Sequence, residues 1–304
     1  MPRKQNKIER SRVALLAALY GGLFFLLYFV SFRHAVLPEL ALDIIDPKAS
    51  SFRNLPIQAK AVYVLDSKLE KEIYSVNGDV PLPFASIAKI MTAVCALDAL
   101  GRDGRVLIEK GDVDPLGRLV LRAGESWKAK DLVSYMLVES SNDAARALAR
   151  AAGGEPSIVS CMNKRADELG LYDTKFANGT GLDIADSPGA YGSAHDATRL
   201  LYRAMILYPD IFEKTGKESY NMMSDSGREY KVKNTDRVTG EIMGFVASKT
   251  GLTDLAGGNL VYAMNVGLGH VIIVAILGST EEGRFADAIL LSNAIIQNLG
   301  NTQI

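Results

Sequence analysis

The chain has 304 residues, 48% of them hydrophobic and 23% charged, a composition typical of a globular protein with a full apolar core. Its 34 basic and 35 acidic residues give a net charge of −1, so no overall positive field favours nucleic acid as a partner. With three histidines lacking metal-ligand spacing and only two cysteines, the sequence predicts neither a metal site nor a bound cofactor.

The N-terminal region differs in kind from the rest of the chain. Residues 1–12 carry five basic side chains and are expected to form a cytoplasmic tail. Residues 13–32 are uncharged and apolar, and as a helix they would span a bilayer core of about 30 Å. We expect an uncleaved, single-pass anchor in the cytoplasmic membrane, because this run exceeds the apolar length of a signal peptide and no clear cleavage motif follows. A cleaved signal peptide is the alternative, and residues 33–58 are expected to form a stalk on the extracytoplasmic side.

Residues 59–304 have the pattern of one folded domain. Alternating β-branched and aromatic residues predict strands at 61–65 and 72–76, and a run of helix formers predicts a helix at 87–100. The further expected elements are helices at 128–137, 143–152, 157–170, 196–208 and 281–299, and strands at 244–250, 259–266 and 270–277. The economical arrangement is an α+β fold, in which the first and last segments pair in one five-stranded antiparallel sheet flanked by helices, with a helical lobe from the middle of the chain.

Ser86 and Lys89 lie three residues apart at the start of the helix expected at 87–100. Residues at this spacing share one face of a helix, so the Ser86 hydroxyl and the Lys89 amine can meet as a nucleophile and its base. A helix N-terminus would also favour negative charge developing on Ser86. Lys89 acts as a base only without its proton, and we expect burial and the nearby Lys249 to lower its pKa. Alone, a serine followed three residues later by lysine is a frequent pattern.

Ser140 and Asn142 lie on the turn expected between the helices at 128–137 and 143–152. A turn of this kind presents side chains to a cleft. The alternative is an ordinary helix N-cap, since serine and asparagine are favoured there.

Lys249, Thr250 and Gly251 lie on or just after the first C-terminal strand. The glycine would allow close approach of a ligand backbone. Lys249 would supply a fixed positive charge for a carboxylate, and Thr250 and Thr253 would supply hydroxyl donors. A phosphate-binding loop is excluded because Ser248 stands where that loop requires glycine.

The two cysteines are expected to be separate buried thiols, although pairing in an oxidising compartment is the alternative. Cys95 lies nine residues after Ser86, about half a turn around the helix, and should therefore face the core rather than the site.

The three motifs, in this order and spacing, resemble those of the penicillin-recognising serine enzymes, and most closely the low-molecular-weight D-alanyl-D-alanine carboxypeptidases. The segment at 85–93 resembles the nucleophile segment of these enzymes. The segment at 176–182 resembles a loop that they share, with Gly179 where proline is usual. The resemblance covers residues 62–296 and implies a DD-peptidase/β-lactamase-like fold.

The resemblance also implies a role for each motif. Ser86 would be the nucleophile and Lys89 its base, Ser140 would relay the proton to the leaving amine, and Asn142 would hold either the substrate amide or Lys89. The backbone N–H groups of Ser86 and Leu252 would bind the oxyanion. The substrate-binding residues would be Lys249, Thr250, Gly251, Leu252 and Thr253.

The expected activity is removal of the terminal D-alanine from a peptidoglycan stem peptide through an acyl-enzyme, with β-lactams as covalent inhibitors. The peptide would lie antiparallel along the strand at 244–250. A DD-endopeptidase that cuts cross-links with the same residues is the alternative. A β-lactamase is less favoured because no E-x-x-L-N segment lies between Asn142 and Lys249. An inactive wall-binding module is less favoured because the motif residues are intact. The sequence leaves the oligomeric state open.

Overall fold

A computed structural model of the protein describes residues 50–114 and 121–301. The predicted tail at 1–12, the predicted anchor at 13–32 and most of the predicted stalk lie outside these residues. Within the described part of the chain, no helix is long and apolar enough to cross a membrane.

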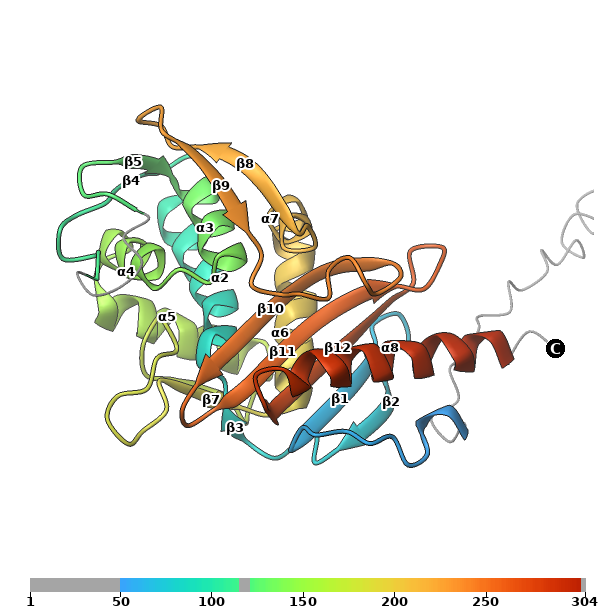
Figure 1. The fold of residues 1–304 in the computed structure, drawn as a ribbon. Coiled ribbons are helices and arrows are strands. Elements are labelled where there is room, and N and C mark those ends of the chain that lie inside the picture. The colour runs from blue at the N-terminus through green and yellow to red at the C-terminus, as the bar shows by residue number, and fades with distance from the viewer. Residues whose placement is uncertain (1–49, 115–120, 302–304) are drawn as a thin grey trace, which may run out of the picture. The chain divides into compact units, whose positions relative to one another are not determined.

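A five-stranded antiparallel sheet forms the centre of the fold (Figure 1). Its strands, in spatial order, are β10 (Phe245–Thr253), β11 (Gly257–Asn265), β12 (Val271–Ser279), β1 (Ala61–Asp66) and β2 (Lys71–Val76). Strands β1 and β12 pair with Val62 opposite Ile276, so the first and last parts of the domain meet in one sheet, as predicted. Strand β10 forms one edge of this sheet.

Side chains of the central strands alternate between two apolar cores. On β1, Val62 and Val64 enter one core and Tyr63 and Leu65 the other, as expected for a strand covered on both faces. Helix α8 (Gly283–Asn301) and the short η1 (Ser50–Phe52) cover the first face. Helix α6 (Ala194–Leu207) and the 3₁₀ turn η2 (Ala85–Ala88), which runs into α2 (Lys89–Leu100), cover the second.

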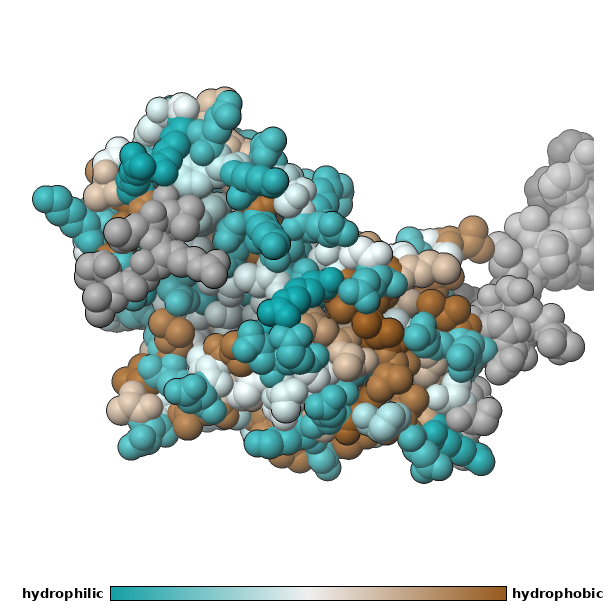
Figure 2. Space-filling model, in the orientation of Figure 1, coloured by the Kyte–Doolittle hydropathy of each residue, from teal (hydrophilic) through white to brown (hydrophobic). Residues whose placement is uncertain are grey.

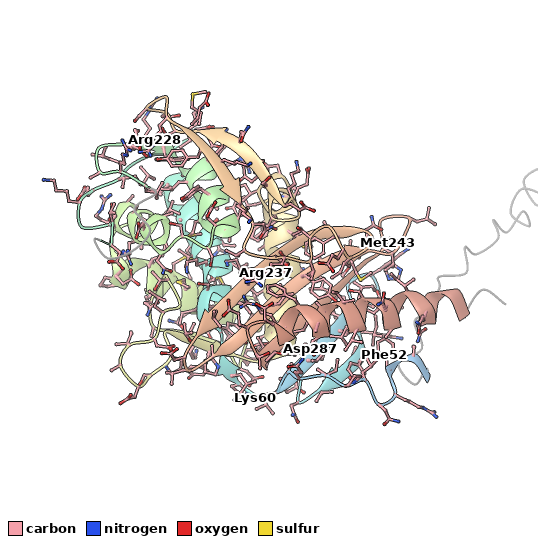
Figure 3. The ribbon with its side chains drawn as sticks, viewed as in Figure 1. Phe52, Lys60, Arg228, Arg237, Met243 and Asp287 are labelled. Atoms are coloured by element: carbon pink, nitrogen blue, oxygen red, sulfur yellow. A yellow bond between two sulfur atoms is a disulfide. The ribbon has the colours of Figure 1, made fainter. Side chains whose placement is uncertain are left out.

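The end of the predicted stalk packs on this domain. Asp287 of α8, labelled in Figure 3, accepts hydrogen bonds from the backbone N–H groups of Gln58 and Ala59, both at 2.9 Å. Phe52 is buried and stacks on Tyr74 with ring centroids 5.2 Å apart. Residues 50–58 are thereby fastened to the sheet and to α8.

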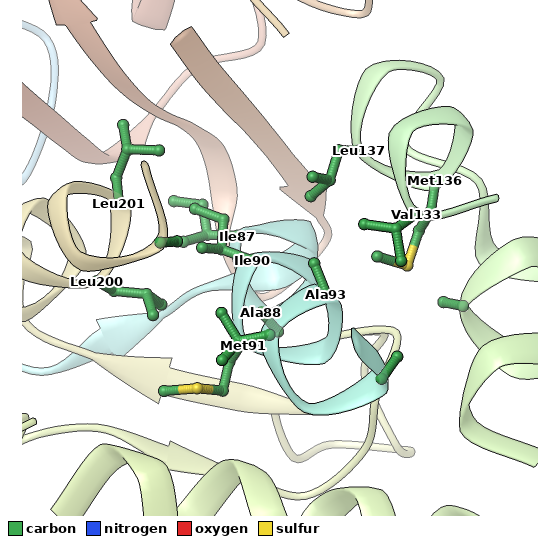
Figure 4. Close-up of a cluster of buried hydrophobic side chains, with 14 of the residues drawn as sticks. Ile87, Ala88, Ile90, Met91, Ala93, Val133, Met136, Leu137, Leu200 and Leu201 are labelled. Atoms are coloured by element: carbon green, nitrogen blue, oxygen red, sulfur yellow. The ribbon is translucent and has the colours of Figure 1, made fainter. Parts of the chain in front are cut away.

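The lobe beside the sheet is built around α2. Its neighbours are the helices α3 (Ala129–Val138), α4 (Asn142–Ala151) and α5 (Glu155–Glu168). Figure 4 shows side chains of α3 and α6 packed around the first turns of α2, with Ile90, Met91 and Ala93 in the cluster. Because α2 has buried side chains on nearly all sides, packing with its neighbours holds it in place.

Several small elements were not predicted from the sequence. The lobe carries a hairpin of β8 (Ser219–Met223) and β9 (Glu229–Lys233), where the sequence indicated mainly helices and loops. The other additions are η2 (Ala85–Ala88), α7 (Pro209–Lys214), and the short strands β3 (Leu82–Pro83), β4 (Arg105–Leu107), β5 (Ser126–Lys128), β6 (Lys175–Phe176) and β7 (Ala190–Gly192). These elements are too short for a periodic pattern to show.

The surface shown in Figure 2 is mainly hydrophilic over the helical lobe, whereas hydrophobic residues gather over α8.

The two cysteines form a disulfide, so the expectation of separate thiols was wrong. Cys95 on α2 and Cys161 on α5 have Cα atoms 6.0 Å apart, within the usual range for a disulfide. Cys95 is buried, as expected, but it faces α5. The sequence did not show that α5 packs against α2, and this packing brings together two residues separated by 66 positions.

Replacing both cysteines by alanine is expected to lower the free energy of unfolding by about 2–4 kcal/mol, because the bridge closes a long loop in the unfolded chain. Denaturant unfolding of the double variant measures this loss, and the reduced wild-type protein should show a loss of similar size. Unfolding curves that coincide for all three proteins would contradict the prediction.

Candidate active site

The predicted nucleophile lies on a tight turn that leads into α2. Ser86 belongs to the 3₁₀ turn η2. The sequence predicted a helix that begins at Ile87, but α2 begins at Lys89. Ala85 has a positive φ of 49°, which is costly for a residue with a Cβ and is typical of functional turns. Gly251 of β10 lies against this turn: a Cβ there would stand 2.7 Å from the carbonyl oxygen of Phe84. The glycine therefore allows the chain's own backbone to approach β10, where the sequence suggested approach by a ligand.

The side chains of Ser86 and Lys89 meet as predicted. Lys89 Nζ lies 2.7 Å from Ser86 Oγ, 2.8 Å from Asn142 Oδ1 and 2.6 Å from the carbonyl oxygen of Thr180. Lys89 is completely buried, and burial is the main cause that lowers its pKa to about 7, with a smaller effect of the positive charge of Arg146. The predicted depression is confirmed, but Arg146 takes the place of Lys249 as the charged neighbour that lowers this pKa.

These three contacts orient the amine of Lys89. Asn142 Oδ1 and the Thr180 carbonyl oxygen carry no proton, so each can only accept a hydrogen bond from Nζ. A neutral amine has two N–H groups and one lone pair. Donation to both acceptors uses the two N–H groups and leaves the lone pair for the hydroxyl proton of Ser86.

Ser140 lies on the turn between α3 and α4, and Asn142 is the first residue of α4, but neither is the side-chain N-cap of that helix. The oxygen of Ser141 accepts a hydrogen bond from the backbone N–H of Ala144 at 3.2 Å, and this caps the helix. Ser140 has a positive φ of 55°, another strained position for a non-glycine residue. The N-cap role that the sequence left as an alternative for Ser140 and Asn142 therefore belongs to Ser141, which lies between them.

Lys249 approaches the site from β10. Its Nζ donates hydrogen bonds to Ser140 Oγ and to the backbone carbonyl oxygen of the next residue, Thr250, each at 2.8 Å. Lys249 is almost fully buried, and this burial, followed by the charges of Lys89 and Arg284, lowers its pKa well below the usual lysine value. The fixed positive charge expected at Lys249 is therefore costly while no anion is present.

A cleft of about 550 Å³ opens between the lobe and β10. It is lined by Ser86, Ser140, Asn142, Thr250, Gly251 and Leu252, whereas Lys89 and Lys249 lie behind its wall. Thr253 does not line the cleft, and its hydroxyl accepts a hydrogen bond from the N–H of Ala256 at 3.2 Å in the turn after β10. All the predicted catalytic residues and all the predicted binding residues except Thr253 thus converge on one site.

Among the residues of the cleft that the sequence did not indicate, two contact the predicted binding residues. Arg284, from the first turn of α8, is buried and donates from Nη1 to the carbonyl oxygen of Gly251 at 2.7 Å. The hydroxyl of Thr235 lies 2.6 Å from that of Thr250. Neither belongs to a short motif, and only the meeting of α8 and the 234–237 segment with β10 reveals them.

A family model described as D-alanyl-D-alanine carboxypeptidase, peptidase family S11, matches residues 48–280, and the chain belongs to this family. It is similar to the D-alanyl-D-alanine carboxypeptidase DacB2 of Mycobacterium tuberculosis, with 32% identity over 66% of this chain and 68% of the relative. It is also similar to the D-alanyl-D-alanine endopeptidase of Escherichia coli, with 30% identity over 76% of this chain and 75% of that protein.

Among solved structures, penicillin-binding protein D2 of Listeria monocytogenes in its ampicillin-bound form has a similar fold. The TM-score is 0.70 at 30% sequence identity, and the match covers 80% of this chain and 98% of that one. The predicted relationship to penicillin-binding DD-peptidases is confirmed.

Proposed function

We propose that this protein is a serine D-alanyl-D-alanine carboxypeptidase that removes the terminal D-alanine from peptidoglycan stem peptides. The observation that carries the proposal is the distance of 2.7 Å between Ser86 Oγ and Nζ of a buried lysine whose pKa is lowered to about 7. At neutral pH a large fraction of Lys89 is then unprotonated and able to act as a base.

In the acylation step, Lys89 takes the hydroxyl proton as Ser86 Oγ attacks the carbonyl carbon of the penultimate D-alanine. The resemblance assigns the backbone N–H groups of Ser86 and Leu252 to the developing oxyanion, and both residues line the cleft. Ser140 Oγ, hydrogen-bonded to Lys249, is placed to relay this proton: it gives its own hydroxyl proton to the leaving amine as the C–N bond breaks and takes the proton held by Lys89, which returns to the neutral amine. Terminal D-alanine departs, and water then hydrolyses the ester on Ser86.

The carboxylate of the substrate fits the other side of the cleft. Thr250 offers a hydroxyl there and Arg284 a buried guanidinium, and Lys249 lies directly behind. A carboxylate in this position would stabilise the protonated form of Lys249, which burial alone disfavours. The outer edge of β10 is unpaired by any strand of the described residues, so an extended peptide can add to it.

A DD-endopeptidase is the second candidate, favoured by the similarity to the Escherichia coli endopeptidase at nearly the same identity as the carboxypeptidase. Both reactions break a bond between D-alanine and an amine that carries a carboxylate. They differ only in the size of the leaving group.

The test is incubation of the full-length protein, in mild detergent, with a cell-wall pentapeptide and separately with a cross-linked dimer of stem peptides. Mass spectrometry then follows both the peptides and the protein. Loss of one D-alanine, absent in Ser86→Ala, supports the carboxypeptidase. Cleavage of the dimer alone supports the endopeptidase. No cleavage and no covalent penicillin on Ser86 would overturn both.

The lowered pKa of Lys89 predicts the pH dependence of acylation by penicillin. The unprotonated amine is the base, so the second-order rate constant should fall about tenfold per pH unit below pH 6 and level off above pH 8. Rapid-quench measurements between pH 5 and 10 give this profile. A rate that still climbs tenfold between pH 8 and 9 would contradict it, because Lys89 would then titrate near its ordinary value.

We also propose that residues 13–32 anchor the protein in the cytoplasmic membrane with the enzyme on the extracytoplasmic side. The uncharged run with its basic flank supports this, and so does the disulfide, since disulfides persist mainly outside the cytoplasm. N-terminal sequencing of the membrane-extracted protein tests it. A sequence that starts beyond residue 32 would show a cleaved signal peptide instead.

A further inference from the structure

The Thr180 carbonyl group that accepts a hydrogen bond from Lys89 belongs to a loop held from three sides. Within the loop, Asn178 Oδ1 accepts hydrogen bonds from Thr180 N at 3.1 Å, from Thr180 Oγ1 at 2.9 Å and from Gly181 N at 2.7 Å. Gly181 has a positive φ of 76°, and a Cβ there would stand 2.0 Å from the carbonyl oxygen of Ala85. The loop therefore lies directly against the nucleophile turn.

Gly179, the residue before Thr180, is tied to two helices through its backbone carbonyl and its backbone N–H. The carbonyl oxygen of Gly179 accepts a hydrogen bond from Thr92 Oγ1 of α2 at 2.7 Å. The N–H of Gly179 donates to Glu155 Oε1 at the start of α5, at 2.6 Å. Proline at position 179 would have no N–H for this second bond.

Helix α5 is in turn fixed to α2. The disulfide joins Cys161 to Cys95, and Thr92 Oγ1 lies 3.6 Å from the sulfur of Met162. Lys89, Thr92 and Cys95 follow one another at intervals of three residues and so lie along one side of α2. The same side of the helix thus contacts the Thr180 carbonyl, the Gly179 carbonyl and α5.

We propose that Glu155 is a positioning residue for the acylation step. By holding the Gly179 amide, it fixes the Thr180 carbonyl at the distance where this group takes one N–H of Lys89, and the lone pair of the amine then stays directed at Ser86. This inference rests on the proposed role of Lys89 as the base. Glu155 itself does not line the cleft.

A purely structural role is the competing explanation. A carboxylate in the first turn of a helix stabilises that helix through the helix dipole, and Glu155 is the first residue of α5. Glutamine at this position separates the two roles, because its amide oxygen still accepts a hydrogen bond from Gly179 N–H but carries no charge.

The experiment compares acylation by a fluorescent penicillin in full-length wild type, Glu155→Ala and Glu155→Gln, with thermal melting of each. Glu155→Ala is expected to acylate about three- to tenfold more slowly, the loss of one positioned hydrogen bond. Glu155→Gln should stay within about twofold of wild type even where its melting temperature drops. Equal rates for Glu155→Ala and wild type would overturn the proposal, and so would a glutamine variant as slow as the alanine variant.

Two variants of the partner residue complete the test. Gly179→Pro removes the N–H and should match Glu155→Ala, whereas Gly179→Ala keeps the N–H and places a Cβ 3.6 Å from its nearest neighbour, in ordinary contact. The double variant Glu155→Ala/Gly179→Pro should be no slower than either single variant, because both remove the same bond. Additive losses would overturn the proposal.

The pH profile supplies a readout that helix stability alone does not change. The charged groups that act on Lys89 and Lys249 include Arg146 on α4 and Arg284 on α8, and these variants leave both in place. A displaced Thr180 carbonyl stabilises the ammonium form less, so the acid limb of Glu155→Ala should move to lower pH. An acid limb that coincides with that of wild type would contradict the role. Acylation of the wild-type protein tests the proposed function itself. The rates of the Glu155 variants are compared with the wild-type rate and therefore test the role of Glu155 separately.

Discussion

Lys89→Met is expected to reduce the rate of acylation by penicillin by about 1,000-fold, within the range of 10²–10⁴ usual for loss of a positioned base. Methionine keeps the length of the side chain and its burial but has no group that can accept the Ser86 proton. The variant should still fold, because methionine fills the same buried space and removes the desolvation cost of the amine. Its stability should fall by about 1–3 kcal/mol, since Asn142 Oδ1 and the Thr180 carbonyl oxygen lose their donor. Quenched-flow labelling followed by mass spectrometry of the Ser86 peptide gives the rate.

Lys231→Met is the matched control, since Lys231 is exposed on β9 and does not line the cleft. It should acylate at the wild-type rate. If Lys89→Met acylated within tenfold of wild type while remaining folded, Lys89 would not be the base. The proton of Ser86 would then have to reach another group, and Ser140 with Lys249 would be the next candidate pair at this site.

The central sheet could be predicted because its strands carry a strong local pattern. The run of valine and isoleucine on β12 has high strand propensity and lies next to β1, where it is buried from both faces. The hairpin of β8 and β9 lacks that run of β-branched residues, since β8 reads SYNMM, β9 reads EYKVK, and each strand has only five residues. Tertiary contact with α3 rather than propensity forms this hairpin.

The site could be predicted where its residues are close in sequence. Ser86 and Lys89 meet because the turn η2 runs directly into α2, so a spacing of three was sufficient. The pairing of Cys95 with Cys161 and the contact of Arg284 with Gly251 depend on how separate helices pack. No pattern within one segment reports such packing. For the same reason, Arg146 rather than Lys249 emerged as the charged neighbour that lowers the pKa of Lys89.

Arg284 illustrates what a motif leaves out of a site. It follows the Lys249–Gly251 motif by 33 residues, yet it reaches back and donates to the carbonyl oxygen of Gly251. Its Nε is buried without a hydrogen-bond partner among the described residues, and its side chain lines the cleft beside Thr250. A guanidinium that lines the cleft at this place is suited to bind the terminal carboxylate of a peptide.

Arg284→Ala is therefore expected to lower kcat/KM for a peptide that ends in a free D-alanine carboxylate by about 10- to 100-fold, as for loss of a charge-assisted hydrogen bond. The matched substrate is the same peptide with its C-terminus amidated, which has no negative charge for Arg284 to bind. Wild type should strongly prefer the acid, and Arg284→Ala should lose most of that preference while its rate on the amide changes little. Arg284→Lys keeps the charge but loses the planar guanidinium, and its preference for the acid should lie between those of wild type and Arg284→Ala. An equal loss on acid and amide would instead mean that Arg284 supports β10 through Gly251 and does not recognise the carboxylate.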